Sequence, residues 1–309
     1  MPRETFDLSH RFLGSRERLS FDEIVRVVRT MVRLGVRKLR LTGGEPLLRP
    51  NLTDLIGDLT TLEGIEDIAL TTNGMLLAKY AFELKAAGLR RVTVSLDSLD
   101  PEIFQRMSGG FSGLEEALAG IAQAQRAGLH PIKINVVVQR GVNDHTILPL
   151  LERFRGTGVS VRFIEYMDVG NRNQWRADAV VPSKELLARI AQRWPLAAIE
   201  PSYRGEVAQR YAFADGGGEV GFISSITQPF CGDCHRARLS SDGILYTCLF
   251  ATHGTALRER LRSGASDDDL LALVRDIWRA RTDNYSERRQ ARPTQNVDER
   301  KVEMFYIGG

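Results

Sequence analysis

The sequence predicts an α/β protein in which parallel strands form an open or curved barrel with a polar inner side, followed by a smaller domain that carries three cysteines. One observation is the regular alternation of strand-like runs with helical patterns, which is typical of parallel strands joined by crossover helices. Another is that polar side chains recur on one side of these runs. We expect the barrel to span residues 1–200 and a C-terminal α+β domain to span 201–309, because 309 residues have room for two domains.

The predicted elements follow one another in a simple order. Ser20 and Glu23 have the spacing of a capping box, which opens an amphipathic helix that ends at Gly35. The strand-like runs cover 36–44, 66–74, 90–98, 131–138 and 159–167. Helical patterns lie between them, near 51–60, 76–87, 113–127 and 146–156.

Alternation along these runs shows which side chains share a face. Lys38 and Arg40 lie opposite Leu39 and Leu41, and the later runs repeat this division. Parallel strands that are covered on both sides are normally apolar on both sides, so a polar side indicates a barrel that lines a wet cavity. The other residues placed on the polar side are Thr42, Thr71, Asn73, Thr93, Ser95, Asp97, Lys133 and Asn135.

The charge on that polar side indicates the kind of ligand. Lys38, Arg40 and Lys133 face inward, and Asp97 is the one carboxylate assigned to the same side. A buried cation without a partner costs several kcal/mol, so this surplus favours an anionic small molecule. The alternative is that the long side chains reach solvent at the barrel mouth.

The second half of the chain has a different pattern. A helix is predicted from Pro182-Ser183 to about Trp194, and short strands with Gly-rich turns begin at Pro201. Helices are expected near 254–263 and 266–281. The segment 286–300 has no periodicity.

All three cysteines lie in this second part. Cys231 and Cys234 have C-x2-C spacing, and Cys248 follows after thirteen residues, which is a metal-site pattern. This spacing fits an iron–sulfur cluster with one open iron. It also fits a zinc ion with His235 or His253 as fourth ligand, and purely structural thiols are the third alternative. Arg236 and Arg238 would point to one side of a strand, which suits an anion beside the metal.

Composition excludes several classes of protein. A net charge of +3 is too small to indicate nucleic-acid binding, and no apolar run is long enough for a signal peptide or a membrane span. Hydrophobic residues make up 43% and charged residues 26% of the chain, as in ordinary globular proteins. Three cysteines in a metal-like pattern fit a reducing cytoplasm better than a disulfide framework.

Several motifs together resemble one family. They are Thr42-Gly43-Gly44-Glu45-Pro46, Thr71-Thr72-Asn73-Gly74, Ser95-Leu96-Asp97-Ser98, the three cysteines with Arg236 and Arg238, and the terminal Gly308-Gly309. Their order and spacing cover nearly the whole chain and are similar to those of the GTP 3′,8-cyclases. These are radical S-adenosylmethionine enzymes of molybdenum cofactor biosynthesis.

The resemblance implies an incomplete (β/α)6 TIM-like barrel and two [4Fe–4S] clusters. One cluster reduces S-adenosylmethionine, and the other leaves an iron open to the base of GTP. The implied reaction converts GTP to (8S)-3′,8-cyclo-7,8-dihydroguanosine 5′-triphosphate. Relatives of this kind are often dimers, and a pterin-forming enzyme would receive the product.

The resemblance also implies roles for individual residues. Cys231, Cys234 and Cys248 would hold the substrate-side cluster, and the tail Gly308-Gly309 would enter the active site together with Arg236 and Arg238. The residues expected to contact S-adenosylmethionine are Gly43, Gly44, Glu45, Ser95 and Met167. The residues expected to contact GTP are Lys38, Arg40, Thr71, Lys133, Arg162, Arg236 and Arg238. Met167 is out of phase with Arg162 on a simple strand, so we expect a β-bulge between them.

One departure from the family pattern matters. The family holds its radical-generating cluster with a C-x3-C-x2-C loop that is followed by Met-Pro, and this chain begins Met1-Pro2 with no cysteine before Cys231. The first strand of the barrel is therefore expected to be missing, and the chain as written to be inactive. The alternatives are a clipped enzyme, a non-catalytic GTP- and iron–sulfur-binding relic, and a zinc-stabilised barrel protein.

Overall fold

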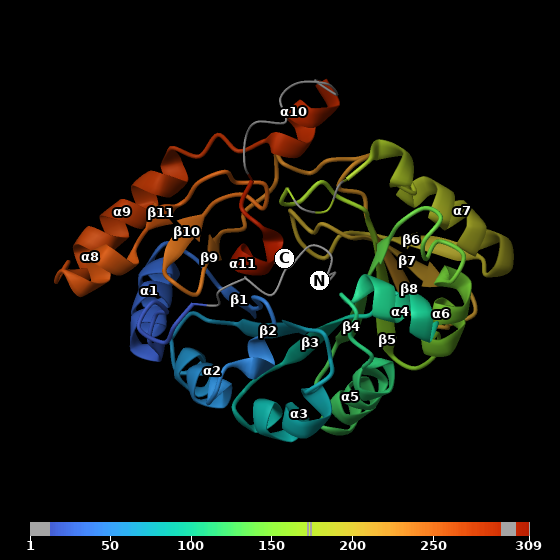
Figure 1. Ribbon diagram of the computed structural model, residues 1–309, viewed down its shortest axis with the longest axis horizontal. Helices are drawn as coiled ribbons and strands as arrows, with labels where there is room; N and C mark the ends of the chain where they lie inside the picture. Colours follow the sequence, from blue (N-terminus) through green and yellow to red (C-terminus); the bar gives the residue numbers. More distant parts are fainter. Residues whose placement is uncertain (1–12, 172, 174, 292–300, 309) are drawn as a thin grey trace.

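A curved sheet with helices along its outer side forms most of the molecule (Figure 1). The computed structural model describes residues 13–171, 173, 175–291 and 301–308. Five parallel strands follow one another in sheet order and in chain order: β1 (Lys38–Leu41), β2 (Asp67–Thr72), β3 (Arg91–Ser95), β4 (Ile132–Val138) and β5 (Val159–Glu165). These are the five runs predicted from the sequence, and their parallel pairing confirms the α/β class.

Three further strands extend the same sheet beyond β5. β8 (Glu219–Ile223) pairs with β5 in parallel, β7 (Gln209–Phe213) pairs with β8 antiparallel, and β6 (Leu196–Ile199) pairs with β7 antiparallel. The sheet is therefore mixed, which is consistent with a partial barrel of the TIM type. β7 and β8 belong to the segment assigned to the second domain, so this sheet crosses residue 200, and the division at that residue stays a prediction.

The helices of the first part lie where the 3.6-residue pattern predicted them. Ser20 Oγ accepts a hydrogen bond from Glu23 N, and the Glu23 side chain accepts one from Ser20 N, so the predicted capping box is formed. The helices are α1 (Phe21–Arg33), α2 (Leu52–Thr60), α3 (Leu77–Ala86), α5 (Leu114–Arg126), α6 (Ile147–Phe154) and α7 (Ser183–Arg193), with short 3-10 turns η1 (Pro46–Leu48) and η2 (Ala177–Ala179).

Three short helices of the described ranges were not predicted, and one of them is the four-residue α11 (Met304–Ile307) near the C-terminal end. α4 (Pro101–Met107) begins with Pro101 and is capped by Asp100, whose carboxylate accepts hydrogen bonds from Glu102 N and Ile103 N. α10 (Tyr285–Ala291) lies in a segment without apolar periodicity. α4 and α10 are only about two turns long and α11 is shorter still, and periodicity is a weak signal over so few residues.

The outer face of the sheet and the helices enclose the main apolar core. Ile134 and Val136 on β4 are fully buried, and Phe163 on β5 packs against Phe222 on β8 with ring centroids 6.0 Å apart. The alternate residues of these strands face the other way, away from the helices. This alternation leaves the polar residues on the inner face of the curve.

The C-terminal part packs against the start of the barrel. A small antiparallel sheet of β9 (Arg238–Leu239), β10 (Ile244–Tyr246) and β11 (Thr255–Ala256) is followed by α8 (Arg258–Arg262) and α9 (Asp267–Arg279). α9 lies beside α1, and Val27 shares an apolar cluster with Leu245, Leu257 and Leu270 (Figure 1). The last described element, α11 (Met304–Ile307), lies near the centre of the molecule (Figure 1). None of the helices in the described ranges has the length and apolar character that a membrane span needs.

Candidate active site

The inner face of the sheet carries a row of cationic and hydroxyl side chains. Arg40 Nη1 donates hydrogen bonds to Thr71 Oγ1 at 2.7 Å and to Thr93 Oγ1 at 3.2 Å. The strand register places Thr71 opposite Thr93 and Thr93 opposite Lys133, so these side chains share one face, as the alternation predicted. Arg162 on β5 lies opposite Asn135, and its Nε donates to Asn135 Oδ1 at 3.0 Å.

Burial and mutual repulsion lower the pKa values of these cationic side chains. Burial, together with the charge of Arg162, lowers the pKa of Lys133 to about 8. Burial and the charge of Arg40 lower the pKa of Arg162 to about 10. Within the described residues, Lys38, Arg40, Lys133 and Arg162 form no ion pair with a carboxylate. An anionic ligand would offset both the cost of burying these cations and the repulsion between them.

The carboxylate assigned to this face from the sequence is that of Asp97. β3 ends at Ser95, so Asp97 is past the strand, and its side chain accepts a hydrogen bond from Val137 N at 2.8 Å. Burial raises the pKa of Asp97 to about 6. Among the described residues Asp97 thus bonds the backbone of β4 and forms no ion pair with the inward cations, so its place on the inner face stays a prediction.

The inner face also holds residues that sequence reasoning missed. Arg91 on β3 donates from Nε to Asp67 Oδ2 at 2.7 Å, and its place two residues before Thr93 was the available signal. Tyr203, in the segment before β7, has its ring centroid 4.2 Å from Lys38 Nζ. Glu206 and Glu219 both interact with Arg210. These long-range neighbours could not be read from a local pattern.

The Gly-Gly-Glu-Pro turn lies at the carboxyl end of β1. Gly43 has φ +141°, a backbone conformation that other residues rarely adopt. The Glu45 carboxylate accepts hydrogen bonds from Thr72 Oγ1 and Asn73 N, each 2.8 Å away, and so holds this turn against the end of β2. Ser95 is exposed at the end of β3. The residues predicted to contact S-adenosylmethionine thus lie at the strand ends where barrel active sites form.

Met167 lies in the loop after β5. The strand ends at Glu165, and Tyr166 and Met167 are beyond it. The expected bulge between Arg162 and Met167 is therefore unnecessary. A residue outside the strand does not have to follow its alternation.

The C-x2-C segment forms a turn beside a group of arginines. Cys234 N donates to Cys231 O at 3.0 Å, and Arg236 Nη2 donates to Cys234 Sγ at 3.3 Å. Burial opposes ionisation of Cys234, but Arg236 and Arg281 together lower its pKa to about 7. Burial raises the pKa of Cys248, whose Sγ accepts a hydrogen bond from Phe250 N at 3.4 Å.

The three thiols suit a soft metal centre by chemistry, since all are free and two lie among cations. Their arrangement is not that of a formed ligand set. Across 13–171, 173, 175–291 and 301–308, no group of three or more His, Cys, Asp or Glu side chains is placed to hold a metal ion. His235 and His253, the fourth ligands considered for zinc, lie within these ranges. The three-cysteine cluster therefore stays a proposal.

Gly308, the last residue that the structure describes, lies between Arg238 on β9 and Thr42 after β1. Arg238 Nε donates to Gly308 O at 3.1 Å, and a Cβ atom on Gly308 would lie 2.4 Å from Thr42 Cγ2. Gly308 is thus in contact with both Arg238 and the start of the Gly-Gly-Glu-Pro motif. Gly309 lies outside the described residues. The charge of Arg40 lowers the pKa of Arg162, whereas the pKa of Arg238 is affected by Arg236 and by the thiols. The cationic side chains therefore form two separate groups.

Comparison with known proteins agrees with this geometry. The Radical SAM superfamily model matches residues 4–154, and the Molybdenum Cofactor Synthesis C model matches residues 159–287. A solved structure described as native anSMEcpe with bound AdoMet has a TM-score of 0.55 and 16% sequence identity, and covers 85% of this chain and 74% of that chain. At this identity the likeness concerns the fold. The barrel and the family models define a radical SAM protein, a class that implies S-adenosylmethionine and a [4Fe–4S] cluster.

Relatives of much higher identity define the family within that class. A protein named GTP 3′,8-cyclase from Xanthomonas axonopodis pv. citri is 57% identical over 295 residues, which are 96% of this chain and 87% of that protein. A protein of the same name from Acidothermus cellulolyticus is 50% identical over 331 residues. The match covers 100% of this chain and 91% of that protein. The chain belongs to the GTP 3′,8-cyclase family of molybdenum cofactor biosynthesis.

Proposed function

We propose that this protein binds GTP and S-adenosylmethionine and forms (8S)-3′,8-cyclo-7,8-dihydroguanosine 5′-triphosphate. The observation that carries the proposal is the inner face of the sheet, where Arg40, Lys133 and Arg162 lie together without a paired carboxylate among the described residues. A triphosphate supplies the missing negative charge, and charge-assisted hydrogen bonds from arginine to phosphate are among the strongest polar contacts in proteins.

The roles follow from position. Lys38, Arg40, Thr71, Lys133 and Arg162 would bind GTP along the inner face. Arg236, Arg238, Gly308 and Gly309 would close the site at the C-terminal side, where Arg238 already holds the tail. The chain's own task is to orient the ribose and the base and to exclude water.

The cofactors would be held at two places. Gly43, Gly44, Glu45, Ser95 and Met167 would contact S-adenosylmethionine at the strand ends. Cys231, Cys234 and Cys248 would hold a [4Fe–4S] cluster on the substrate side. When bound, S-adenosylmethionine and a reduced cluster supply the radical chemistry, which belongs to the cofactors and not to the side chains.

We further propose that the 309-residue chain by itself does not cleave S-adenosylmethionine. The sequence has three cysteines, and all three are assigned to the substrate-side cluster. Cluster ligation requires thiolates, so none is left for a second cluster. A homodimer and a pterin-forming enzyme as recipient of the product belong to the same proposal.

Calorimetric titration of the 309-residue protein with GTP and with guanosine tests the anion site. We expect GTP to bind and guanosine to bind far more weakly. In the variant R236A/R238A, loss of about 1.5–3 kcal/mol per charge-assisted contact should weaken GTP binding while leaving iron content unchanged. R275A/R279A, on the exposed side of α9, is the matched control. Equal affinity for GTP and guanosine, or for the double variant and the wild type, would contradict the proposal.

A further inference from the structure

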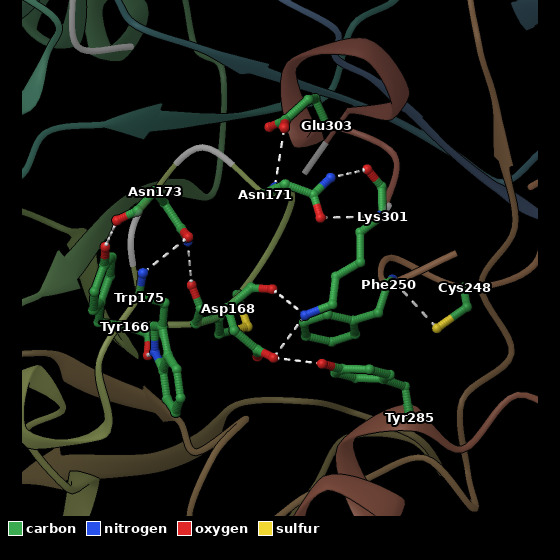
Figure 2. A network of polar contacts seen from close by, with 11 residues as sticks. Tyr166, Asp168, Asn171, Asn173, Trp175, Cys248, Phe250, Tyr285, Lys301 and Glu303 are labelled. Atoms are coloured by element: carbon green, nitrogen blue, oxygen red, sulfur yellow. Dashed lines mark hydrogen bonds and ion pairs between the residues drawn. The ribbon is translucent and has the colours of Figure 1, made fainter. Parts of the chain in front are cut away.

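The last described segment, 301–308, is held by the loop that follows β5. Asn171 forms three hydrogen bonds with it: its N donates to Glu303 Oε1 at 3.0 Å, its Nδ2 donates to Lys301 O at 2.6 Å, and its Oδ1 accepts from Lys301 N at 3.1 Å (Figure 2). These contacts join parts of the chain that are about 130 residues apart. They fix the path of the tail before it reaches Gly308.

A nearly buried ion pair lies beside these contacts. Lys301 Nζ donates to Asp168 Oδ2 and to Asp168 O, each at 2.8 Å, and Tyr285 OH donates to Asp168 Oδ2 at 2.6 Å (Figure 2). The side chains of Lys301 and Asp168 are 15% and 12% exposed. A buried pair is maintained only where further hydrogen bonds satisfy both charges, so this geometry is sensitive to small displacements.

Aromatic rings extend the contact toward Cys248. Lys301 Nζ is 4.5 Å from the centroid of the Tyr285 ring, which stacks on Phe250 at 4.6 Å. Val302 N donates to Ala251 O at 2.8 Å. Lys301 therefore contacts both the loop after β5 and the segment that follows Cys248.

A glycine makes the close approach possible. Gly170 has φ +69°, and a Cβ atom there would lie 2.2 Å from Glu303 Oε2. Any other residue would be strained and would push Glu303 away. The loop is therefore shaped to receive the tail at this point.

Each end of this contact leads along the chain to a residue that the proposed function uses. Met167 directly precedes Asp168, and its carbonyl oxygen accepts a hydrogen bond from Asn173 Nδ2 at 2.8 Å (Figure 2). On the other side, α11 leads from Glu303 to Gly308, where Arg238 holds the chain end. The Asp168–Lys301 pair thus fixes the distance between the predicted cofactor residue and the predicted substrate-side tail.

We propose that Lys301 and Asp168 are positioning residues, which lock the C-terminal tail onto the loop after β5 and thereby place Gly308 beside Arg238. This role in the reaction rests on the proposed function, whereas docking of the tail does not. Loss of the pair should release the tail while leaving the barrel folded.

Hydrogen exchange of the 309-residue protein, read by mass spectrometry, tests the docking. In K301M we expect the peptide that contains the Ile307 and Gly308 amides to exchange at least about tenfold faster, because breaking a buried pair favours local opening. K301R should restore slow exchange. K184M, at an exposed lysine on α7, should behave as wild type. Unchanged exchange in K301M would overturn the proposal.

Two further variants separate docking from general stability. G170A should also accelerate exchange of the tail, since it displaces Glu303 without touching the ion pair. L84A, in the buried core of α3, should lower the melting temperature but leave exchange of the tail slow. L84A and K301M are compared at temperatures equally far below their melting temperatures. If exchange of the tail were then as fast in L84A as in K301M, the effect would reflect global stability and the proposal would fail.

GTP titration of the same proteins links docking to function. We expect K301M and G170A to bind GTP more weakly than wild type, and K301R and L84A to bind it normally. Faster tail exchange with unchanged GTP affinity would remove the role in positioning. Absence of GTP binding by the wild type would instead contradict the proposed function and leave the exchange result valid.

Discussion

Arg238 donates a hydrogen bond from Nε to the carbonyl oxygen of Gly308, 3.1 Å away, and so ties β9 to the end of the chain. Burial, with the charge of Arg236, lowers the pKa of Arg238 to about 10, so the guanidinium stays charged at neutral pH. One cation therefore faces both the tail and the proposed substrate site.

Replacing Gly308 by alanine should weaken GTP binding. Gly308 has φ +73°, and the added Cβ would meet Thr42 Cγ2 at 2.4 Å, so the tail would have to move. G216A is the matched control, because Gly216 has φ +79° but a Cβ added there would have no other atom within 4 Å. In both variants alanine at a positive φ costs about 1 kcal/mol of backbone strain. Only G308A should also alter the affinity for GTP in a calorimetric titration. Equal affinities would mean that the tail does not reach the nucleotide.

The affinity for GTP should fall as the pH rises through about 8. Lys133 has a pKa of about 8, so its ammonium is present below that pH and lost above it. Burial and the charges of Arg162 and Arg91 lower this pKa, while Glu219 and Glu206 act in the opposite direction. Arg162, with a pKa of about 10, stays charged throughout. GTP titrations at pH values from 7 to 9, about one unit to each side of the Lys133 pKa, should show a falling GTP affinity in the wild type. The K133Q variant should show little of this fall. An equal decline in K133Q would assign it to another group.

Glu165 should be a major contributor to stability. It is 1% exposed at the end of β5, and its carboxylate accepts hydrogen bonds from Ser183 N, Ile226 N and Thr227. In E165A these buried donors lose their partner, which should lower the free energy of unfolding by roughly 2–4 kcal/mol. E185A, which removes an exposed pair with Arg140, should cost less than about 1 kcal/mol. Urea denaturation compares the two, and similar losses would contradict this account of Glu165.

Reconstitution with iron and sulfide should yield one [4Fe–4S] cluster per 309-residue chain and no 5′-deoxyadenosine, because the sequence supplies three cysteines. Iron and sulfide analysis, electron paramagnetic resonance and product chromatography measure this. The variant C231A/C234A/C248A should bind no cluster. Zinc without iron would favour a zinc-stabilised protein, and turnover by this polypeptide would contradict the assignment of its thiols.

Local patterns were sufficient for much of the barrel. The alternation of Ile132, Lys133 and Ile134 predicted both strand β4 and the face on which Lys133 lies, because successive side chains of a strand point to opposite sides. Ser20 and Glu23 predicted the start of α1, because a capping box lies within four residues. The motif at Thr42–Pro46 likewise marked the end of β1.

The sequence by itself thus determined the five strand runs β1 to β5 and the family, since periodicity and motifs are properties of neighbouring residues. Only the tertiary structure decided that Asp97 bonds the backbone of β4, that Met167 lies beyond β5, and that Lys301 pairs with Asp168. The physical reason is distance along the chain. Lys301 and Asp168 are separated by 133 residues, so their contact depends on how the barrel and the C-terminal part pack together.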